Sequence, residues 1–291
     1  MHHDDRPRRS VLYMPGSNPR ALAKGRDVPA DGLIFDLEDA VSPDAKTAAR
    51  GHIEAALTDR RAYGRREIIV RTNGLDSQWG RDDLLAMARA GADAILLPKV
   101  ESTTMIDAAL AVLDEADAPA GLPIWCMMET PRGILHVEEI ADHPAVSCLV
   151  LGTSDLTKDM RSLHTATRLP MLPSLGLCLL AARAAGIAVL DGVHLDLADL
   201  EGHAASCRQG RELGFDGKTL IHPKQIEAAN IAFAPGSEEI AWSKRIIEAW
   251  EAATAEGKGV VLVDGRLIEN LHIAEARRLL ALSAAIGELN A

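Results

Sequence analysis

Apolar residues gather in short runs that recur along most of the chain, separated by stretches of mixed polarity. The runs are continuous rather than alternating, which is typical of parallel strands buried on both faces. The intervening stretch 43–59 has a proline at its start and an apolar stripe, as expected of an amphipathic helix. Stretches 80–92, 103–116 and 201–214 are also compatible with helices. The apolar runs occupy residues 10–14, 32–37, 67–71, 94–99, 123–128, 148–152, 187–191 and 218–222.

Eight strands alternating with helices predict an α/β fold, and specifically a (β/α)₈ TIM barrel, because right-handed crossovers place each strand beside the next. A doubly wound open sheet is the alternative. Such a sheet usually carries a glycine-rich fingerprint after its first strand, and the segment "PGSNPR" at 15–20 is not one. We therefore predict a barrel domain over residues 1–235.

Residues 236–291 extend beyond what a barrel requires. A long helix is expected at 237–257, followed by a short apolar piece, an Asp264-Gly265 turn, a second apolar piece and a last helix. The pattern alone leaves three interpretations open. The extension is a lid, an arm exchanged between subunits, or a buttress for the barrel.

Composition narrows the class of partner. A net charge of −11 and an aromatic content of 3% disfavour nucleic acid and anionic membranes as partners. No apolar run approaches the roughly 20 residues that span a bilayer. The four cysteines are far apart and form no C-x-x-C pair, which favours free thiols in a reducing compartment. We expect a cytoplasmic protein that acts on small molecules.

Charged side chains follow the predicted strands at the ends where a barrel places its active site. Arg71 closes the third run, Lys99 the fourth, and Glu129 follows the fifth. The remaining charged or titratable residues at such ends are Asp36, Glu38, Asp39, Asp155, Asp191, His194, Asp196, His222 and Lys224. Together they favour a functional site over isolated surface charges.

Glu129 and Asp155 are expected at the ends of adjacent strands and are candidate ligands for one hard divalent cation. Two carboxylates, completed by water and substrate oxygens, form a usual Mg²⁺ site, and the same donors accept Mn²⁺. For either residue alone, a helix cap or an ion pair with Arg71 or Lys99 is an equally good interpretation.

A series of motifs resembles the citrate lyase β-subunit-like family, which includes malyl-CoA and citramalyl-CoA lyases within the wider HpcH/HpaI aldolase group. The resemblance runs from about Arg9 to Glu269. It is carried, in order, by "PGSNPR", "LIFDLEDAV", "IIVRTNGLD", "ILLPKV", "METPRGI", "LGTSDL", "GFDGKTLIHPKQI" and "DGRLIE". It implies a Mg²⁺-dependent barrel that cleaves or forms 3-hydroxyacyl-CoA thioesters, assembled as a homotrimer or a hexamer.

The resemblance also implies roles for individual residues. Glu129 and Asp155 would be the Mg²⁺ ligands, and Arg71 would bind the oxygens of the small oxoacid. Asp36, Glu38 and Asp39 would surround the metal-bound waters and the basic groups. The CoA part of the substrate would meet Asn18, Arg20, Lys24, Lys46 and Arg50, with His222 and Pro223 bordering its cleft.

One motif departs from the family pattern. CoA-lyase members carry a catalytic aspartate in "DGRLID", commonly acting as a lid residue on a neighbouring subunit, whereas this chain has Glu269 at that position. The carboxylate sits one methylene further out, and small displacements of a catalytic group lower rates strongly. Three outcomes stay open: a base for a shifted substrate, thioester hydrolysis, or a nearly inactive lyase. The segment 158–174 is expected to form a loop that sets substrate choice, with a plain surface loop as the alternative.

The leading functional hypothesis is a Mg²⁺-dependent carbon–carbon lyase acting on malyl-CoA, citramalyl-CoA or a similar thioester. A malyl-CoA thioesterase keeps the same site but ends in hydrolysis. A free-acid aldolase is disfavoured by the basic residues near "PGSNPR" and by the C-terminal tail. A β subunit of a citrate lyase complex, acting on an acyl-carrier thioester, is the alternative from a different class.

Overall fold

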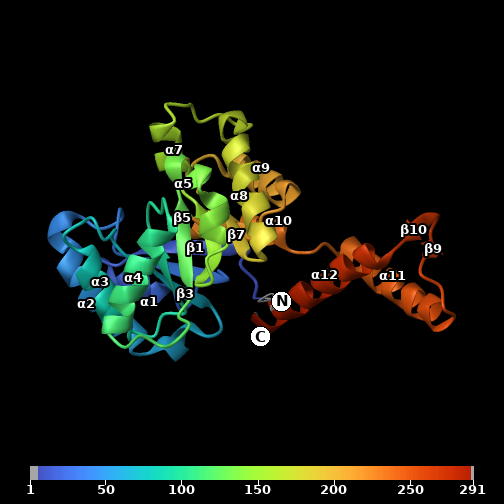
Figure 1. The fold of residues 1–291 in the computed structure, drawn as a ribbon, viewed down its shortest axis with the longest axis horizontal. Helices are drawn as coiled ribbons and strands as arrows, with labels where there is room; N and C mark the ends of the chain where they lie inside the picture. The colour runs from blue at the N-terminus through green and yellow to red at the C-terminus, as the bar shows by residue number, and fades with distance from the viewer. Residues whose placement is uncertain (1–5, 290–291) are drawn as a thin grey trace. The chain divides into compact units, whose positions relative to one another are not determined.

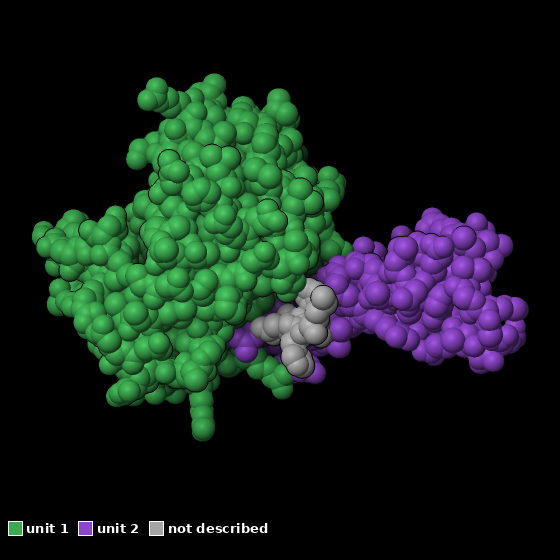
Figure 2. Space-filling model, in the orientation of Figure 1, with its two compact units in different colours: residues 1, 8–233 green, residues 2–7, 234–291 purple. Residues whose placement is uncertain are grey.

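The computed structural model describes residues 6–289. The chain divides into two compact units, one running from Arg8 to Phe233 and the other beginning at Ala234 (Figure 2). The four cysteines are buried and unpaired. Within the described range, no helix has both the length and the apolar composition needed to cross a lipid bilayer.

The first unit is a closed barrel of eight parallel strands (Figure 1). Closure is direct, because Val11 of the first strand pairs with Thr219 of the last. This pairing confirms the predicted TIM barrel and excludes the open sheet. The strands are β1 (Ser10–Pro15), β2 (Gly32–Asp36), β3 (Glu67–Arg71), β4 (Ala94–Leu97), β5 (Ile124–Met128), β6 (Val146–Leu151), β7 (Ala188–Asp191) and β8 (Gly217–Leu220).

Helices connect the strands. Helices are present in all the stretches that the sequence marks as compatible with them, at 43–59, 80–92, 103–116 and 201–214. Four short 3₁₀ segments accompany them: η1 (Pro43–Ala45), η2 (Arg60–Tyr63), η3 (Leu169–Met171) and η4 (Pro223–Gln225). The helices are α1 (Pro19–Lys24), α2 (Lys46–Leu57), α3 (Gly80–Met87), α4 (Thr103–Glu115), α5 (Pro131–Leu135), α6 (Val137–Ala141), α7 (Thr153–Asp159), α8 (Leu172–Ala185), α9 (Leu200–Leu213) and α10 (Ile226–Phe233).

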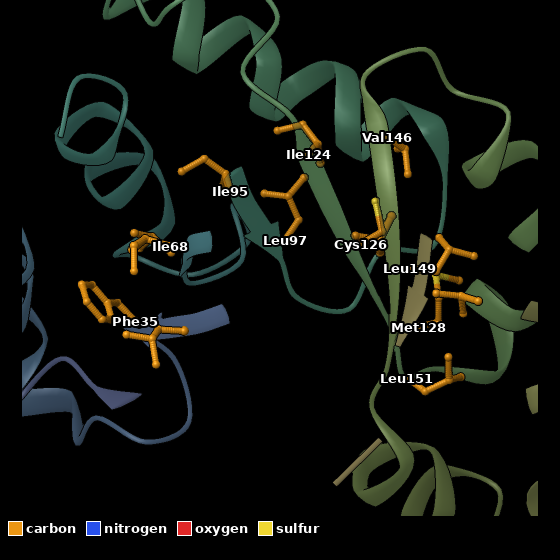
Figure 3. Close-up of a cluster of buried hydrophobic side chains, with 14 of the residues drawn as sticks. Phe35, Ile68, Ile95, Leu97, Ile124, Cys126, Met128, Val146, Leu149 and Leu151 are labelled. Atoms are coloured by element: carbon orange, nitrogen blue, oxygen red, sulfur yellow. The ribbon is translucent and has the colours of Figure 1, made fainter. Parts of the chain in front are cut away.

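The strands bury both faces, which explains why their sequences are continuously apolar. Ile34 of β2 joins the cluster inside the barrel, whereas its neighbour Phe35 packs in the layer between strands and helices. Figure 3 shows that outer layer, in which Phe35, Ile68 and Ile124 belong to one buried cluster. The barrel is therefore a packed core, and chemistry is confined to its rim.

The second unit pairs two helices around a hairpin. It contains α11 (Ser237–Ala255), β9 (Val261–Val263), β10 (Arg266–Ile268) and α12 (Asn270–Leu289). The predicted Asp264-Gly265 turn joins the two strands, and both residues have positive φ, at 48° and 76°, as a two-residue hairpin requires. The unit has its own small core, formed by Ile246, Ile268, Ile273 and Ala276.

Candidate active site

Asp36 and Arg71 form the buried base of the site, at the carboxyl ends of β2 and β3, where they are paired in register. Arg71 donates from Nε and Nη2 to the two oxygens of Asp36, at 2.7 and 2.6 Å. Asp36 also accepts from the backbone N–H of Glu38 and Ala40. Such a two-point charged pair fixes the guanidinium strongly. Asp36 therefore occupies the fork of Arg71, and Nη1 is the nitrogen left for other partners.

Arg71 is held from two further directions. Its Nη1 lies 2.8 Å from Glu38 Oε2 and 3.6 Å from Asp39 Oδ2. Its guanidinium carbon lies 4.9 Å from the centroid of the Tyr13 ring, a cation–π arrangement. Burial raises the pKa of Tyr13, so the ring remains neutral beneath the cation.

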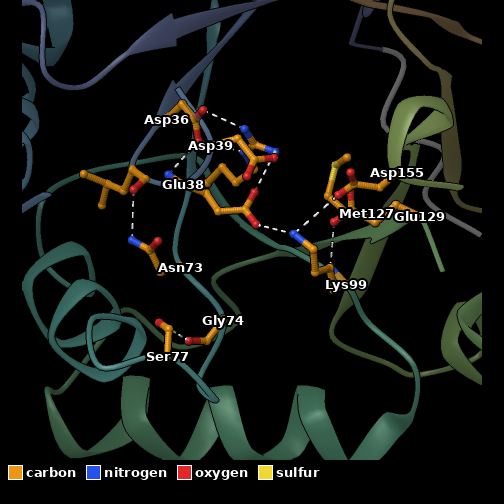
Figure 4. Close-up of polar contacts among 12 residues, drawn as sticks. Asp36, Glu38, Asp39, Asn73, Gly74, Ser77, Lys99, Met127, Glu129 and Asp155 are labelled. Carbon is orange, nitrogen blue, oxygen red and sulfur yellow. Dashed lines mark hydrogen bonds and ion pairs between the residues drawn. The ribbon is translucent and has the colours of Figure 1, made fainter. Parts of the chain in front are cut away.

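Lys99 follows β4 and lies between two groups of carboxylates (Figure 4). Its Nζ donates to Glu38 Oε1 at 2.7 Å and lies 3.5 Å from Asp155 Oδ2. Its backbone N–H donates to Glu129 Oε1 at 2.9 Å. One residue thus contacts carboxylates that follow β2, β5 and β6.

Glu129 follows β5 and is almost fully buried, with 3% of its surface exposed. Burial, reinforced by the nearby Glu38 carboxylate, raises its pKa to about 7. Lys99 and Arg71 oppose this shift without cancelling it. Loss of hydration therefore outweighs the two nearby cations in setting the pKa of Glu129.

The residues after Glu129 explain how a strand can end on a buried acid. Thr130 Oγ1 accepts from the N–H of Gly133 at 3.0 Å, and Pro131 takes the first position of α5. Both are standard features of a helix start. A Cβ on Gly133 would overlap the carbonyl oxygen of Val100. "TPRG" is therefore a compact helix start that turns the chain sharply beside Glu129.

The sequence predicts Asp155 at the end of a strand. In the structure it lies in the first turn of α7 instead. The strand β6 ends at Leu151, and Gly152 and Thr153 turn the chain into the helix. Gly152 is required there, because a Cβ would lie 2.5 Å from Glu129 Oε2. The turn thus places Asp155 and Glu129 on either side of a glycine.

The donor set fits a divalent cation. Five carboxylates, those of Asp36, Glu38, Asp39, Glu129 and Asp155, face the guanidinium of Arg71 and the ammonium of Lys99. The formal excess of three negative charges would fall to one on binding a divalent ion. Glu38 Oε2 is also buried without a hydrogen bond, despite its closeness to Arg71.

Within residues 6–289, no three His, Cys, Asp or Glu side chains are placed to hold a metal ion together. Ligation by two carboxylates, which the resemblance implies for Glu129 and Asp155, would leave other positions for water and substrate. That arrangement is usual for Mg²⁺.

The residues assigned to CoA lie in several environments. Asn18 caps α1 by accepting from the N–H of Ala21 at 3.1 Å, while Arg20 and Lys24 are exposed on that helix. His222 caps η4 by accepting from the N–H of Lys224, beside the exposed Pro223.

The two basic residues of α2 are engaged inside the barrel unit. Lys46 is buried and donates to the carbonyl oxygens of Leu37 and Glu38, both at 2.9 Å. Arg50 pairs with Asp83 at 2.9 Å. In this structure, Lys46 therefore supports the loop after β2, whereas Arg20 and Lys24 are exposed on α1.

Glu269 belongs to the second unit and is exposed directly after β10. Its backbone N–H donates to His272 Nδ1 at 3.0 Å, which fixes the start of α12. In the described part of the chain, its carboxylate makes neither a hydrogen bond nor an ion pair. The side chain is thus available to act elsewhere.

Tyr13 and Gly152 were not assigned a role from the sequence, and Lys99 was considered only as a charged strand end and as an ion-pair partner of Glu129 or Asp155. Tyr13 gives no sequence signal, because a tyrosine in a strand is ordinarily a packing residue. Lys99 does give a sequence signal, since a lysine directly after an apolar run is unusual. Gly152, which precedes the "TSD" of Asp155, gives a signal as well.

Comparison with known proteins identifies the family of the chain. Residues 9–223 match the HpcH/HpaI aldolase/citrate lyase family. The chain is 50% identical over 291 residues to a (3S)-malyl-CoA thioesterase of Cereibacter sphaeroides, covering all of both chains. It is 36% identical over 282 residues to the citrate lyase subunit beta of Escherichia coli K12, covering 95% of this chain and 93% of that protein.

A solved structure is similar as well. CitE from Mycobacterium tuberculosis, crystallised with magnesium, acetoacetate and coenzyme A, is 28% identical, with a TM-score of 0.77 over 94% of this chain and 97% of that one. The family match, the barrel and the citrate lyase relatives together confirm the resemblance noted in the motifs. The protein is an enzyme that belongs to the HpcH/HpaI aldolase/citrate lyase family.

Proposed function

We propose that this protein hydrolyses the thioester of (3S)-malyl-CoA to malate and CoA, using Mg²⁺ held by Glu129 and Asp155. The observation that carries the proposal is the 50% identity, over the whole length of both chains, to relatives named for this reaction. The excess of carboxylates over cations around Glu129 and Asp155 supports it, since two protein ligands would leave coordination positions for water and a substrate. Mn²⁺ would suit the same oxygen ligands.

The substrate has two chemically different ends. Mg²⁺, when bound, supplies a Lewis-acid anchor for the hydroxyl and carboxylate oxygens at one end. Arg71 adds a fixed positive charge through Nη1, because Asp36 holds its other edge. The CoA end would extend over the exposed basic residues of α1, Arg20 and Lys24.

Hydrolysis requires a base near the thioester. In our proposal Glu269 takes a proton from water as the oxygen adds to the carbonyl carbon, and collapse of the intermediate breaks the C–S bond. The CoA thiolate then leaves and takes up a proton. The extension carrying Glu269 would act as a lid on a neighbouring subunit of a cytoplasmic homotrimer or hexamer.

Carbon–carbon cleavage is the second candidate, favoured by the match to citrate lyase subunits. A base removes the proton of the hydroxyl, the bond between the hydroxyl-bearing and methylene carbons breaks, and a thioester enolate forms. Protonation of the enolate yields acetyl-CoA, and the other fragment leaves as glyoxylate. Both reactions use the same anchored end of the substrate.

Product analysis separates the two reactions. The purified protein is incubated with MgCl₂ and (3S)-malyl-CoA or, separately, citramalyl-CoA, and the products are quantified by mass spectrometry. From (3S)-malyl-CoA we expect CoA and malate in equal amounts, with loss of turnover in EDTA and in Glu129→Gln. The matched control is Glu139→Gln on the exposed side of α6, which should retain activity.

Each product pattern decides between the candidates. Formation of acetyl-CoA with an equal amount of glyoxylate would contradict hydrolysis and establish carbon–carbon cleavage as the reaction. Turnover that survives both EDTA and Glu129→Gln would contradict the metal site itself.

A further inference from the structure

Lys99 contacts three of the acidic residues at the rim of the barrel. Its ammonium contacts Glu38 and Asp155, and its backbone N–H contacts Glu129. Its φ is 49°, in the left-handed region that residues other than glycine seldom adopt. Such a conformation persists only where surrounding contacts hold it. The end of strand β4 alone therefore does not explain the backbone conformation of Lys99.

The two cations of the site differ in freedom. Arg71 is fixed by two bonds to Asp36, by Glu38 and by the ring of Tyr13, and its side chain is 8% exposed. The side chain of Lys99 is 47% exposed and is held by ion pairs at its tip. Of these two, Lys99 is the cation that can move without breaking a buried network.

The two ion pairs of Lys99 are also unequal. The contact with Glu38, at 2.7 Å, is a hydrogen bond. The contact with Asp155, at 3.5 Å, is an ion pair without a hydrogen bond. An ammonium beside Asp155 repels any divalent ion that approaches the same carboxylate. The longer contact can be released while the Glu38 bond is kept.

We propose that Lys99 is the exchangeable counter-ion of the metal-free site, and that a divalent cation displaces its ammonium from Asp155 while Glu38 retains it. The inference rests on the proposed assignment of Glu129 and Asp155 as metal ligands. Lys99 is then a positioning residue with two functions. Its N–H orients Glu129, and its charge sets how tightly the metal is held.

The test measures metal binding without substrate. Metal-stripped protein is titrated with Mn²⁺, and free Mn²⁺ is followed by electron paramagnetic resonance. Lys99→Met should bind Mn²⁺ about tenfold more tightly, because a nearby positive charge is removed. Lys99→Gly should also bind more tightly, since glycine accepts the positive φ and keeps the N–H bond to Glu129. Circular dichroism establishes that each variant is folded.

Two further variants complete the design. Lys99→Arg keeps the positive charge and should retain the original affinity. Lys258→Met removes an exposed lysine that pairs with Glu256 in the second unit, and it should leave the affinity unchanged.

The outcomes are distinguishable. Equal or weaker Mn²⁺ binding by Lys99→Met and Lys99→Gly would overturn the inference and leave the metal site intact. Tighter binding by Lys99→Arg as well would overturn it, because a variant that keeps the positive charge would then bind Mn²⁺ as tightly as one that lacks it. No binding by the unsubstituted protein would overturn both the inference and the metal assignment of the proposed function.

Discussion

Gly152 shows how a single missing side chain shapes the candidate metal site. Alanine there would introduce a Cβ that clashes with the Cβ of Glu129 and lies 2.5 Å from its Oε2. Because buried groups at that distance must shift, we expect Gly152→Ala to weaken Mn²⁺ binding by about tenfold or more and to cost about 1–3 kcal/mol of stability. Titration with Mn²⁺ and urea unfolding test both effects. Gly176→Ala, which meets no atom within 4 Å, is the matched control and should retain full Mn²⁺ binding.

Glu129 should also make the metal-free protein sensitive to pH. Its pKa is about 7 when folded against an ordinary carboxyl value of 4.5, so between these values the unfolded chain loses a proton that the folded chain keeps. Stability contributed by this residue therefore falls as pH rises from about 4.5 to 7 and is constant above that range. In EDTA, Glu129→Gln should gain on the order of 2 kcal/mol over the unsubstituted protein between pH 5 and 8. Urea unfolding at both pH values measures it, and a pH-independent difference would contradict the shifted pKa.

At this scale the sequence predicts residue types better than their contacts. Asp36 and Arg71 end neighbouring strands, so their proximity follows from the barrel. The sequence does not predict that Asp36 accepts the hydrogen bonds of Arg71 Nε and Nη2, because a substrate carboxylate would fit those two donors equally well. The left-handed backbone of Lys99 is likewise unpredictable, since no feature of lysine favours positive φ.

Among elements, the segment between α7 and α8 is mostly irregular, yet it is firmly attached at one point. Arg168 Nη1 donates to both oxygens of the buried Asp191, at 2.7 Å each, and its Nε donates to Gln209. Asp191 is also paired with the buried Lys218. Arg168 therefore fastens the segment that follows Asp155 to the end of β7.

Breaking that attachment should release the segment without unfolding the barrel. In Arg168→Met the charged hydrogen bonds, worth about 1.5–3 kcal/mol each, are lost, while Lys218 still neutralises Asp191. We expect trypsin to cleave after the exposed Arg161 about tenfold faster or more. Arg183→Met removes an exposed arginine that pairs with Asp216, and it should leave this cleavage unchanged. Equal cleavage rates in the two variants would show that Arg168 does not hold the segment.

The elements themselves were largely predictable. Continuous apolar runs predicted all eight strands, because burial on both faces removes the polar alternation that would otherwise confuse the assignment. The attachment of Arg168 to Asp191 was not predictable. The two residues are 23 positions apart, and the sequence indicates only that Asp191 ends a strand, not which cation it binds. The helical position of Asp155 was missed because the turn at Gly152 and Thr153 is too short to signal a boundary.

For the whole molecule, our proposal requires that a carboxylate of the second unit act at a site on the barrel. The second unit has its own core and ends its hairpin with an exposed Glu269. The charged groups that surround Glu129 and Asp155 all belong to the barrel unit. A complete site on our proposal therefore needs residues from both units, and the chain that supplies Glu269 can be identified genetically.

Co-expression of two inactive variants makes that identification. Arg71→Met inactivates the barrel site, and Glu269→Gln removes the proposed base. If the lid serves a neighbouring subunit, random assembly pairs an intact barrel with an intact lid in about a quarter of the sites, and about a quarter of the activity returns. If each lid serves its own barrel, no site is intact and none returns. Co-expressed Arg71→Met and Asp155→Asn is the control, because both barrels are then defective and neither arrangement of lids restores turnover.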